Sequence, residues 1–238
     1  MERLDELYID GWQICQDDSL FCFGTDAVLL YGFIPPKSGR VADLCSGNGA
    51  IALMLLAGQK ATEVTAVELQ PQACKLAEKS AALNGCKSRM NVCCGDIRKI
   101  KEILSESSFD TVCVNPPYFK KGSGLLPADK DVAIARHEIC CDIDDVLAAA
   151  EYLLRENGQF YMVHRASREK EICAKIHKYN LMISEICHIF STPSKMGELF
   201  LLRAQKTQKS TDVKYTDFTV LKEDRSLSEA YKAIYGNF

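Results

Sequence analysis

From residue 40 onward, short apolar runs typical of strands alternate with longer runs typical of helices. The strand-like runs cover 41–44, 63–69, 90–94, 109–114 and 159–164, and the helical runs cover 50–56, 72–83, 146–154 and 168–179. We expect Asn157-Gly158 to close the third helical run and Ser167 to cap the fourth. Strands that alternate with helices of this length predict a parallel, doubly wound sheet. Two later runs, 181–190 and 198–204, have no helix between them, so we expect an antiparallel C-terminal hairpin. The sequence therefore predicts an α/β fold with a seven-stranded, mostly parallel sheet.

The chain divides into three predicted regions: 1–39, 40–206 and 207–238. The first is an N-terminal extension with a short apolar helix over 27–33, which Thr25 or Asp26 could cap. This helix is either a packing element or a lid that covers the ligand side of the sheet region. The last region is a tail whose apolar side chains are spaced to dock on the body: Leu227, Tyr231, Ile234 and Tyr235.

Composition narrows the class of protein. A chain of 238 residues that is 47% hydrophobic can bury a substantial core. The net charge of −3 gives no reason to expect nucleic-acid binding, so a polyanionic partner would need a local basic patch. The twelve cysteines include no C-x-x-C pair and lie mostly in apolar runs, so we expect no metal site and a reduced, cytoplasmic location. No apolar run approaches the ~20 residues that span a bilayer, so we expect no membrane association.

A glycine-rich loop, Asp43-Leu44-Cys45-Ser46-Gly47-Asn48-Gly49, joins the first predicted strand of the sheet to the first helix. Gly47 and Gly49 allow the backbone to approach a ligand closely, and the start of the helix offers unpaired N–H groups. Alone, such a loop is weak evidence for a nucleotide site. Ala52 stands where a dinucleotide-binding loop has its third glycine. Alanine is tolerated at that position, so the loop alone does not exclude a nicotinamide cofactor.

Carboxylates follow the next two predicted strands. Glu68 ends the second strand nineteen residues after Gly49, a position from which a carboxylate can accept hydrogen bonds from both ribose hydroxyls. Asp96 follows the third strand and could hold an adenine amino group, with Leu69 or Ile97 packed on the ring. Taken singly, these acids could be turn, cap or solvated strand-end residues. Their position at successive strand ends beside a glycine loop favours a nucleoside site.

The fourth predicted strand, 109–114, is followed directly by Asn115-Pro116-Pro117-Tyr118. The prolines end the strand because proline cannot donate to a sheet ladder. The side-chain oxygen of Asn115 and a rigid main-chain carbonyl of Asn115 or Pro116 provide two fixed acceptors, which suit both protons of a planar NH₂ group. A proline-stiffened turn is the alternative for this motif on its own. Hydride transfer needs no such pair of acceptors, so the motif argues against a nicotinamide enzyme.

Together, these motifs resemble the class I S-adenosylmethionine-dependent methyltransferases that act on amide or exocyclic amino nitrogens and have a Rossmann-like fold. Two flanking segments, Phe21–Leu30 and Ala135–Glu138, are similar to segments of the bacterial tRNA1(Val) adenine-N6 methyltransferases. The resemblance covers roughly residues 10–205, and Cys45 departs from the commoner glycine of the family's first loop. It implies N6 methylation of the adenosine 3′ of the anticodon of a tRNA, with S-adenosyl-L-methionine as cofactor.

The resemblance also implies a role for each motif residue. Asp43, Cys45, Gly47 and Gly49 would surround the methionine portion of the cofactor, Glu68 its ribose, and Asp96, Leu69 and Ile97 its adenine. Asn115 and the Pro116 carbonyl would hold the target amine, and Tyr118 would stack on the adenine face. Cations gather in the following stretch, where we favour phosphate contacts over an ordinary solvated face: Lys120, Lys121, Lys130 and Arg136. Phe119 is a second stacking wall or a buried loop residue, and His137 orients this loop, contacts substrate or is structural. His164, on the fifth predicted strand, is expected to be a packing or surface residue.

Other functions stay open. The same pair of acceptors would suit another planar amine, such as guanine N2 of ribosomal RNA or a protein glutamine. The glutamine enzymes usually have a separate N-terminal helical domain, for which the residues before the first sheet strand leave no room. A module that binds a nucleoside or RNA without catalysis is the alternative of a different class. We expect no metal in the reaction and favour a monomer, although the sequence does not fix the oligomeric state.

Overall fold

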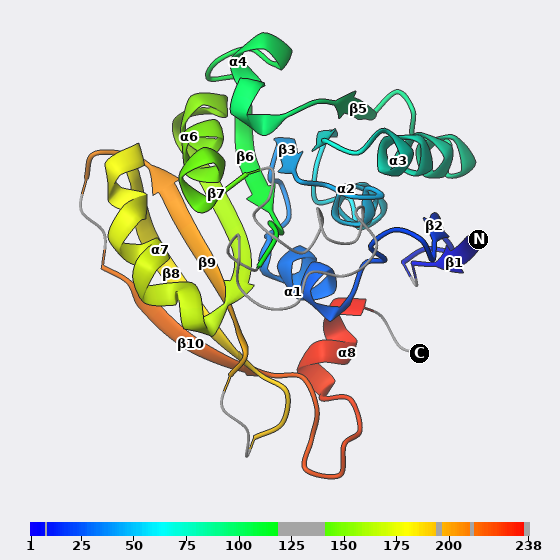
Figure 1. Cartoon of the computed structure of the whole chain (residues 1–238). Coiled ribbons are helices and arrows are strands. Elements are labelled where there is room, and N and C mark those ends of the chain that lie inside the picture. Colours follow the sequence, from blue (N-terminus) through cyan, green and yellow to red (C-terminus); the bar gives the residue numbers. More distant parts are fainter. Residues whose placement is uncertain (8, 119–140, 194–196, 210–211, 236–238) are drawn as a thin grey trace.

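The computed structural model of the protein describes residues 1–7, 9–118, 141–193, 197–209 and 212–235. Its central feature is an eight-stranded sheet with the strand order β10-β8-β9-β7-β6-β3-β4-β5 (Figure 1). The strands are β3 (Arg40–Leu44), β4 (Glu63–Glu68), β5 (Met90–Cys94), β6 (Phe109–Val114), β7 (Leu154–Arg165), β8 (Leu181–Phe190), β9 (Leu199–Lys206) and β10 (Lys214–Thr219). Strands β3 to β7 pair in parallel, whereas β9 runs antiparallel to both β7 and β8.

The predicted α/β class, with a mostly parallel sheet and an antiparallel C-terminal hairpin, is confirmed. The sheet differs from the prediction in one respect, because β10 adds an eighth strand parallel to β8 at the edge of the sheet. This strand lies in the stretch that the sequence marks as a polar tail. None of its six residues is fully buried, so the sequence lacks the apolar face from which a strand could have been predicted here.

Helices cover both faces of the sheet (Figure 1). One face packs against α1 (Thr25–Phe33), α2 (Ala50–Ala57), α3 (Pro71–Leu83) and α8 (Glu229–Tyr235), and the other against α4 (Ile100–Ile103), α6 (Ile143–Leu153) and α7 (Glu169–Ile176). Successive residues of β3 alternate between the two cores, as the pleat of a strand requires: Val41 joins the first, and Ala42 and Leu44 join the second. Every residue of α2 is buried, so this helix is the centre of the first core.

The first helix is positioned from both ends. Gly24, not Thr25 or Asp26, is the N-cap residue of α1, so the predicted side-chain cap is wrong and Asp26 lies in the first helical turn. At the other end, Lys60 Nζ donates to the carbonyl oxygens of Tyr31 and Ile34, each at 2.7 Å. These bonds satisfy two of the carbonyls that a helix end leaves without partners. Burial lowers the pKa of Lys60 to about 8.

Three further local predictions need correction or completion. Asn157-Gly158 does not end a helix, because α6 stops at Leu153 and β7 begins at the next residue. Gly158 instead lies in β7 beside a register irregularity, where an added Cβ would come within 2.8 Å of the Arg155 carbonyl oxygen. Ser167 does not cap a helix, since it lies in the 3₁₀ turn Ala166–Arg168 that precedes α7. In the tail, Tyr231 is buried, and Leu227 and Ile234 pack against the first core.

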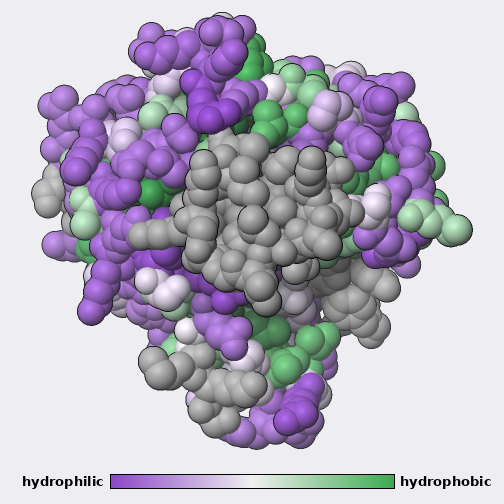
Figure 2. Space-filling view, viewed as in Figure 1, coloured by the Kyte–Doolittle hydropathy of each residue, from purple (hydrophilic) through white to green (hydrophobic). Residues whose placement is uncertain are grey.

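Residues 1–17, which the sequence left unassigned, contain the antiparallel hairpin of β1 (Glu2–Glu6) and β2 (Gln13–Asp17). Hydrophilic side chains make up most of the coloured part of the face in Figure 2, and hydrophobic ones show there only in small groups. In the part of the chain that the structure describes, no helix combines the length and the apolar character needed to cross a membrane.

Candidate active site

A cavity of about 550 Å³ lies at the carboxyl ends of the parallel strands. Chain segments that follow β3, β4, β5 and β6 line it together with Arg165, the last residue of β7, and residues 20–24 with Asp26 and Ala27 close one side. The strand order reverses at β3, since β4 and β5 lie on one side of it and β6 and β7 on the other. Ligands of open α/β sheets bind at such a switch point. We call the part formed by residues 45–48, 68–70 and 95–97 the glycine-loop side, and the part formed by residues 115–118, Asp26 and Arg165 the proline side.

The glycine loop takes an unusual backbone path. Cys45, Gly47 and Gly49 all have left-handed φ angles, of +54°, +56° and +81°. Gly49 also touches its surroundings, because an added Cβ would lie 2.7 Å from Met90 Cε, whereas a Cβ on Gly47 would meet no atom within 4 Å. The left-handed φ of Cys45 is one that glycine adopts without strain. This explains why glycine is the commoner residue of the resembling family at this position. Cys45 and Gly47 line the cavity, whereas Gly49 is packed behind it as the N-cap residue of α2.

Glu68 is held rigidly at the end of β4. Its Oε2 accepts a hydrogen bond from the Gly47 N–H at 2.8 Å, and its Oε1 accepts one from the Gln70 N–H at 2.9 Å. Only 8% of the residue is exposed, and burial raises the pKa of its carboxyl. A carboxylate oxygen has more than one lone pair, so both oxygens can accept further donors from a ligand in the cavity.

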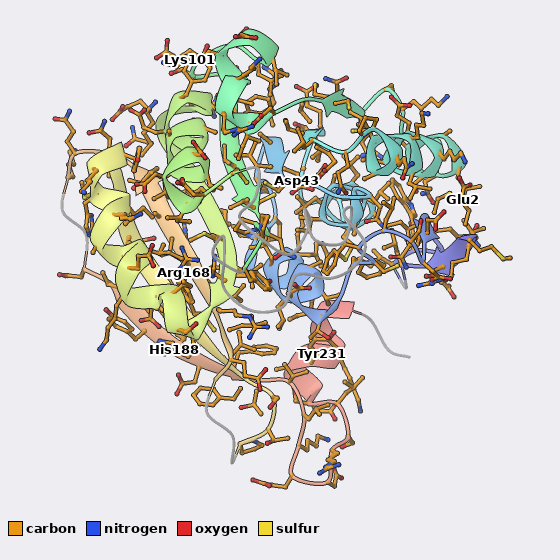
Figure 3. All side chains as sticks on the ribbon, viewed as in Figure 1. Glu2, Asp43, Lys101, Arg168, His188 and Tyr231 are labelled. Carbon is orange, nitrogen blue, oxygen red and sulfur yellow. The ribbon has the colours of Figure 1, made fainter. Side chains whose placement is uncertain are left out.

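Asp43 lies beneath the loop, near the middle of the molecule, whereas Glu2 and His188 lie at its periphery (Figure 3). It is fully buried, and burial raises the pKa of its carboxyl to about 7. Its Oδ1 accepts a weak bond from Cys113 Sγ at 3.6 Å, and its Oδ2 has no partner among the described residues. Asp43 is not among the residues that line the cavity, so this predicted site residue lies behind the glycine loop and supports it.

Asp96 lines the cavity, and its carboxylate is already engaged. Its Oδ1 accepts from the Arg98 N–H at 3.0 Å and its Oδ2 from Arg98 Nη2 at 2.5 Å, and these bonds lower the pKa of the carboxyl. Leu69 and Ile97 line the same part of the cavity. The predicted adenine contacts are therefore brought together, with Arg98 as a neighbour that the sequence did not single out.

On the proline side, Asn115 and Tyr118 line the cavity with Pro116 and Pro117 between them. The Tyr118 hydroxyl lies 2.7 Å from Asn115 Oδ1 and 2.7 Å from Asp26 Oδ2, which comes from α1. Burial raises the pKa of this hydroxyl well above its usual value, so it stays protonated. The sequence predicted Asn115, Pro116 and Tyr118 for this site but considered Asp26 only as a cap.

The Tyr118 ring contacts two side chains from the end of β7. The His164 ring centroid lies 5.3 Å from that of Tyr118, and the Arg165 guanidinium carbon lies 5.9 Å from it, within the range of a cation–π contact. His164 is fully buried, and burial lowers its pKa to about 3. The sequence predicted ligand-binding residues at the ends of the first four parallel strands. The same search at the end of the fifth, β7, would have found Arg165. The predicted loop residues Phe119, Lys120, Lys121, Lys130, Arg136 and His137 lie outside the described residues.

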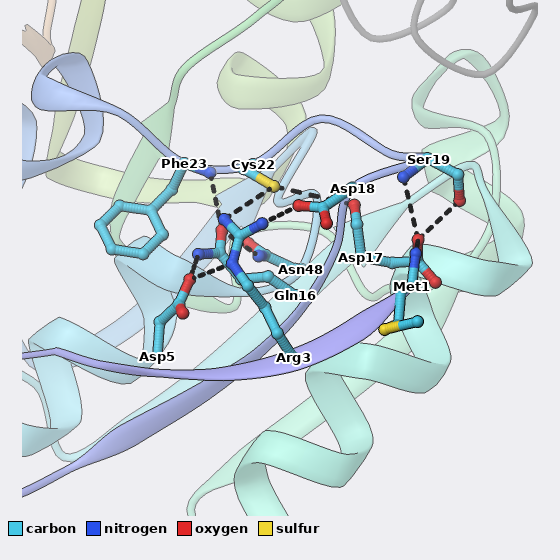
Figure 4. A network of polar contacts seen from close by, with 10 residues as sticks. All are labelled: Met1, Arg3, Asp5, Gln16, Asp17, Asp18, Ser19, Cys22, Phe23 and Asn48. Carbon is cyan, nitrogen blue, oxygen red and sulfur yellow. Dashed lines mark hydrogen bonds and ion pairs between the residues drawn. The ribbon is translucent and has the colours of Figure 1, made fainter.

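The N-terminal hairpin is tied to both the glycine loop and the segment that closes the cavity (Figure 4). Gln16 Oε1 accepts from the Phe23 N–H at 3.1 Å and from Asn48 Nδ2 at 3.2 Å. The Gln16 amide nitrogen donates to Asp5, which also accepts from Arg3 Nε at 2.8 Å. Gln16 is 3% exposed, so this buried amide fixes the position of Phe23 against the loop.

The polar groups that line the cavity include several acceptors: the carboxylates of Glu68, Asp96 and Asp26 and the amide oxygen of Asn115. They suit the O–H and N–H donors of a nucleoside, and the apolar walls suit its base. Within the described ranges, no group of three His, Cys, Asp or Glu side chains could hold a metal ion. Hydrogen bonding to Cys141 and burial raise the pKa of the Cys45 thiol well above its usual value, so this cysteine stays neutral.

Comparison with known proteins identifies the family. The family model of the methyltransferase small domain matches residues 13–182. A tRNA1(Val) (adenine(37)-N6)-methyltransferase of Aeromonas hydrophila is 32% identical over 182 residues, which cover 76% of this chain and 75% of that protein. One of the same name from Histophilus somni is 29% identical over 242 residues, which cover 100% and 98% of the two chains.

Solved structures agree on the fold. A predicted O-methyltransferase of Agrobacterium tumefaciens, protein Atu636, superposes with a TM-score of 0.70 at 21% identity, covering 89% of this chain and 95% of that one. TrmK of M. capricolum, solved with S-adenosyl-homocysteine, gives a TM-score of 0.54 at 12% identity, covering 81% and 71%. The resemblance seen in the sequence motifs is thus confirmed. The chain belongs to the methyltransferase small-domain family and, within it, to the tRNA1(Val) (adenine(37)-N6)-methyltransferases.

Proposed function

We propose that the protein transfers a methyl group from S-adenosyl-L-methionine to the exocyclic N6 amine of an adenosine next to the anticodon of a tRNA. The observation that carries this proposal is the position of Asn115 and Tyr118, which share one cavity with Glu68 and the glycine loop. The names of the relatives from Aeromonas and Histophilus support the choice of tRNA and of adenine N6. A reaction on tRNA places the protein in the cytoplasm.

The glycine-loop side offers the groups that would hold the cofactor, which supplies an electrophilic methyl carbon on a sulfonium. Glu68, held by two backbone N–H groups, would accept hydrogen bonds from the ribose hydroxyls. The adenine would lie near Leu69, Asp96 and Ile97. Asp43, which the resemblance assigns to the methionine portion, lies behind the loop and is not among the residues that line the cavity, so Cys45 and Gly47 would meet that portion instead. Each of these roles uses a group whose position the fold already fixes.

The proline side would hold the target base. The lone pair of an adenine N6 amine is delocalised into the ring, which makes the nitrogen a poor nucleophile. Two acceptors, Asn115 Oδ1 and the Pro116 carbonyl, would draw on its two protons and favour the pyramidal geometry that attack on the methyl carbon needs. The Tyr118 ring would stack on the base. Orientation and stabilisation of the charge that develops on nitrogen would supply most of the acceleration.

The base must leave its stack to enter such a pocket. Extrusion costs a few kcal/mol for a paired base and least for one that is already single-stranded. Sequence-specific RNA recognition targets loops for this reason. An anticodon-loop adenosine therefore suits the cavity better than a base within a duplex.

The test replaces Asn115 by alanine and measures methyl transfer from labelled S-adenosylmethionine to unmodified tRNA, followed by mapping of the label. We expect Asn115→Ala to lower kcat about 10²- to 10³-fold, the range for loss of one preorganised transition-state contact. The cofactor's dissociation constant should stay unchanged. Asn91→Ala, which removes an exposed asparagine of β5, is the matched control. An unchanged rate in Asn115→Ala, or label that maps to ribosomal RNA or to protein glutamine, would contradict the proposal.

A further inference from the structure

The Tyr118 hydroxyl contacts two groups that both present oxygen atoms. It lies 2.7 Å from Asp26 Oδ2 and 2.7 Å from Asn115 Oδ1, and these partners are 92 and 3 residues away in the sequence. A hydroxyl carries one proton, an ionised carboxylate can only accept, and an amide oxygen can only accept. The hydroxyl can therefore donate to one of the two oxygens at a time. The other contact would then bring two oxygens together with no proton between them.

A half-turn of the Asn115 amide about its Cβ–Cγ bond removes this conflict. The half-turn exchanges the amide oxygen and nitrogen, which occupy nearly the same shape. Asn115 Nδ2 then donates to the Tyr118 oxygen, and the Tyr118 O–H donates to Asp26. Every group in this relay has a partner, and the bond to the carboxylate is charge-assisted, which makes it the stronger of the two choices for the hydroxyl.

The half-turn also changes what faces the substrate. Among the described residues, the amide atom of Asn115 that faces away from Tyr118 has no hydrogen-bond partner, and Asn115 lines the cavity. In the relay, this free atom is Oδ1. In the opposite orientation, Oδ1 is occupied by the Tyr118 hydroxyl, and the free atom is an N–H donor that would repel the amine's own protons. Only the relay leaves Asn115 competent to accept from an amine.

We propose that Asp26 is a positioning residue that, through the Tyr118 hydroxyl, fixes the orientation of the Asn115 amide and so presents Oδ1 to the substrate amine. This inference rests on the proposed function of Asn115. Both ends of the relay are held in place: Asp26 lies in the first turn of α1, whose last turn Lys60 holds, and the Tyr118 ring contacts His164 and Arg165.

Two variants break the relay in different ways. Tyr118→Phe keeps the ring and removes the hydroxyl. Asp26→Asn keeps the shape but supplies an N–H that can donate to Tyr118, which frees the hydroxyl to occupy Asn115 Oδ1. We expect each to lower kcat on tRNA about 10- to 100-fold, the cost of misplacing a reacting group. The double variant should be no slower than the slower single variant. Both substitutions interrupt the same chain of hydrogen bonds, so their effects should not add.

The controls separate positioning from stability. Binding of S-adenosylhomocysteine and the melting temperature should stay close to wild type in both variants, and Asp217→Asn, which changes an exposed carboxylate on β10, should behave as wild type throughout. If Tyr118→Phe or Asp26→Asn retained the wild-type kcat, the relay would be overturned. A lower KM for tRNA in Tyr118→Phe would also overturn it, since it would show that the hydroxyl blocks Oδ1.

A spectroscopic readout keeps the two proposals distinguishable. The side-chain NH₂ signals of Asn115, assigned by their loss in Asn115→Asp, should shift in Tyr118→Phe and Asp26→Asn and stay fixed in Asp217→Asn. Unmoved signals would overturn the relay whether or not the wild-type protein methylates tRNA. Failure of the wild-type protein to methylate tRNA would overturn the proposed function and would leave the hydrogen-bond relay to be decided by these signals alone.

Discussion

The two sides of the cavity are built by different means. On the glycine-loop side, backbone N–H groups hold the key carboxylate, since Gly47, which follows the adjacent strand β3, and Gln70, two residues further on, both donate to Glu68. On the proline side, side chains from distant parts of the chain hold the key group, since Asp26 and His164 both contact Tyr118. One side is thus set by backbone groups at adjacent strand ends, and the other is set by packing of side chains.

The difference has a functional reason. A cofactor that is the same in every turnover can be met by a fixed backbone cradle. Under the proposed function, a base that is gripped at its amine needs side-chain groups, and contacts between distant residues fix the orientation of those groups. The segment Leu20–Gly24 serves both sides, because it lines the cavity and is tied through Gln16 to the glycine loop.

The largest expected difference between the sides is in how stability depends on pH. Asp43 under the glycine loop has its pKa raised from 3.8 to about 7, so its contribution to stability is present below pH 4 and lost as pH rises through 7. At His164 the pKa is lowered from 6.5 to about 3, so its contribution is present above pH 6.5 and lost as pH falls toward 3. The two buried groups therefore oppose each other.

Urea unfolding between pH 4 and pH 8 measures both. We expect the stability of the wild type relative to Asp43→Asn to fall by on the order of 4 kcal/mol as pH rises across this range, at 1.36 kcal/mol for each shifted unit. The stability of the wild type relative to His164→Gln should instead fall as pH decreases. Difference curves that are flat, or that slope in the same direction, would contradict the comparison.

A matched pair of glycine substitutions tests the backbone-built side next. Gly47→Ala and Gly49→Ala both place a side chain at a left-handed φ, but only at Gly49 does the new Cβ meet another atom, Met90 Cε at 2.7 Å. We expect Gly49→Ala to lower the free energy of unfolding by about 2–3 kcal/mol, from strain and overpacking together. Gly47→Ala should cost only the strain, about 1 kcal/mol. Equal losses would show that the Met90 side chain moves aside without cost.

The same contrast explains what the sequence could predict. Strand and helix periodicity predicted the sheet class, and the rule that ligands bind at carboxyl ends of parallel strands predicted the cavity wall from Cys45 to Tyr118. These features depend on residues close together in the sequence. The edge strand β10 was missed because its side chains alternate without a buried face. Gly158 was misinterpreted because a glycine at a strand irregularity looks, in sequence, like one that ends a helix.

The contacts that sequence reasoning missed join distant residues. Nothing in the motif around Asp26 indicates that its carboxylate reaches Tyr118, 92 residues further on, because that contact depends on where α1 packs. His164 was expected to be a packing or surface residue, and it is fully buried against the Tyr118 ring. The Asp96–Arg98 pair is local, but either residue could equally have faced the solvent. Packing, rather than propensity, decides such cases.

The smallest expected effect is also the one that divides the two sides most cleanly. Glu68→Gln keeps the shape of the side chain, but an amide nitrogen then faces one of the two N–H groups that the carboxylate accepts, from Gly47 or Gln70. One backbone bond is lost, and so is part of the acceptor capacity for ribose hydroxyls. We expect affinity for S-adenosylhomocysteine, measured by calorimetry, to fall about tenfold, or about 1.4 kcal/mol. At saturating cofactor, kcat should stay at the wild-type value, the reverse of the pattern expected for Asn115→Ala. A fall in kcat without weaker binding would show that Glu68 acts on the reaction itself and that the division between a cofactor side and a substrate side is wrong.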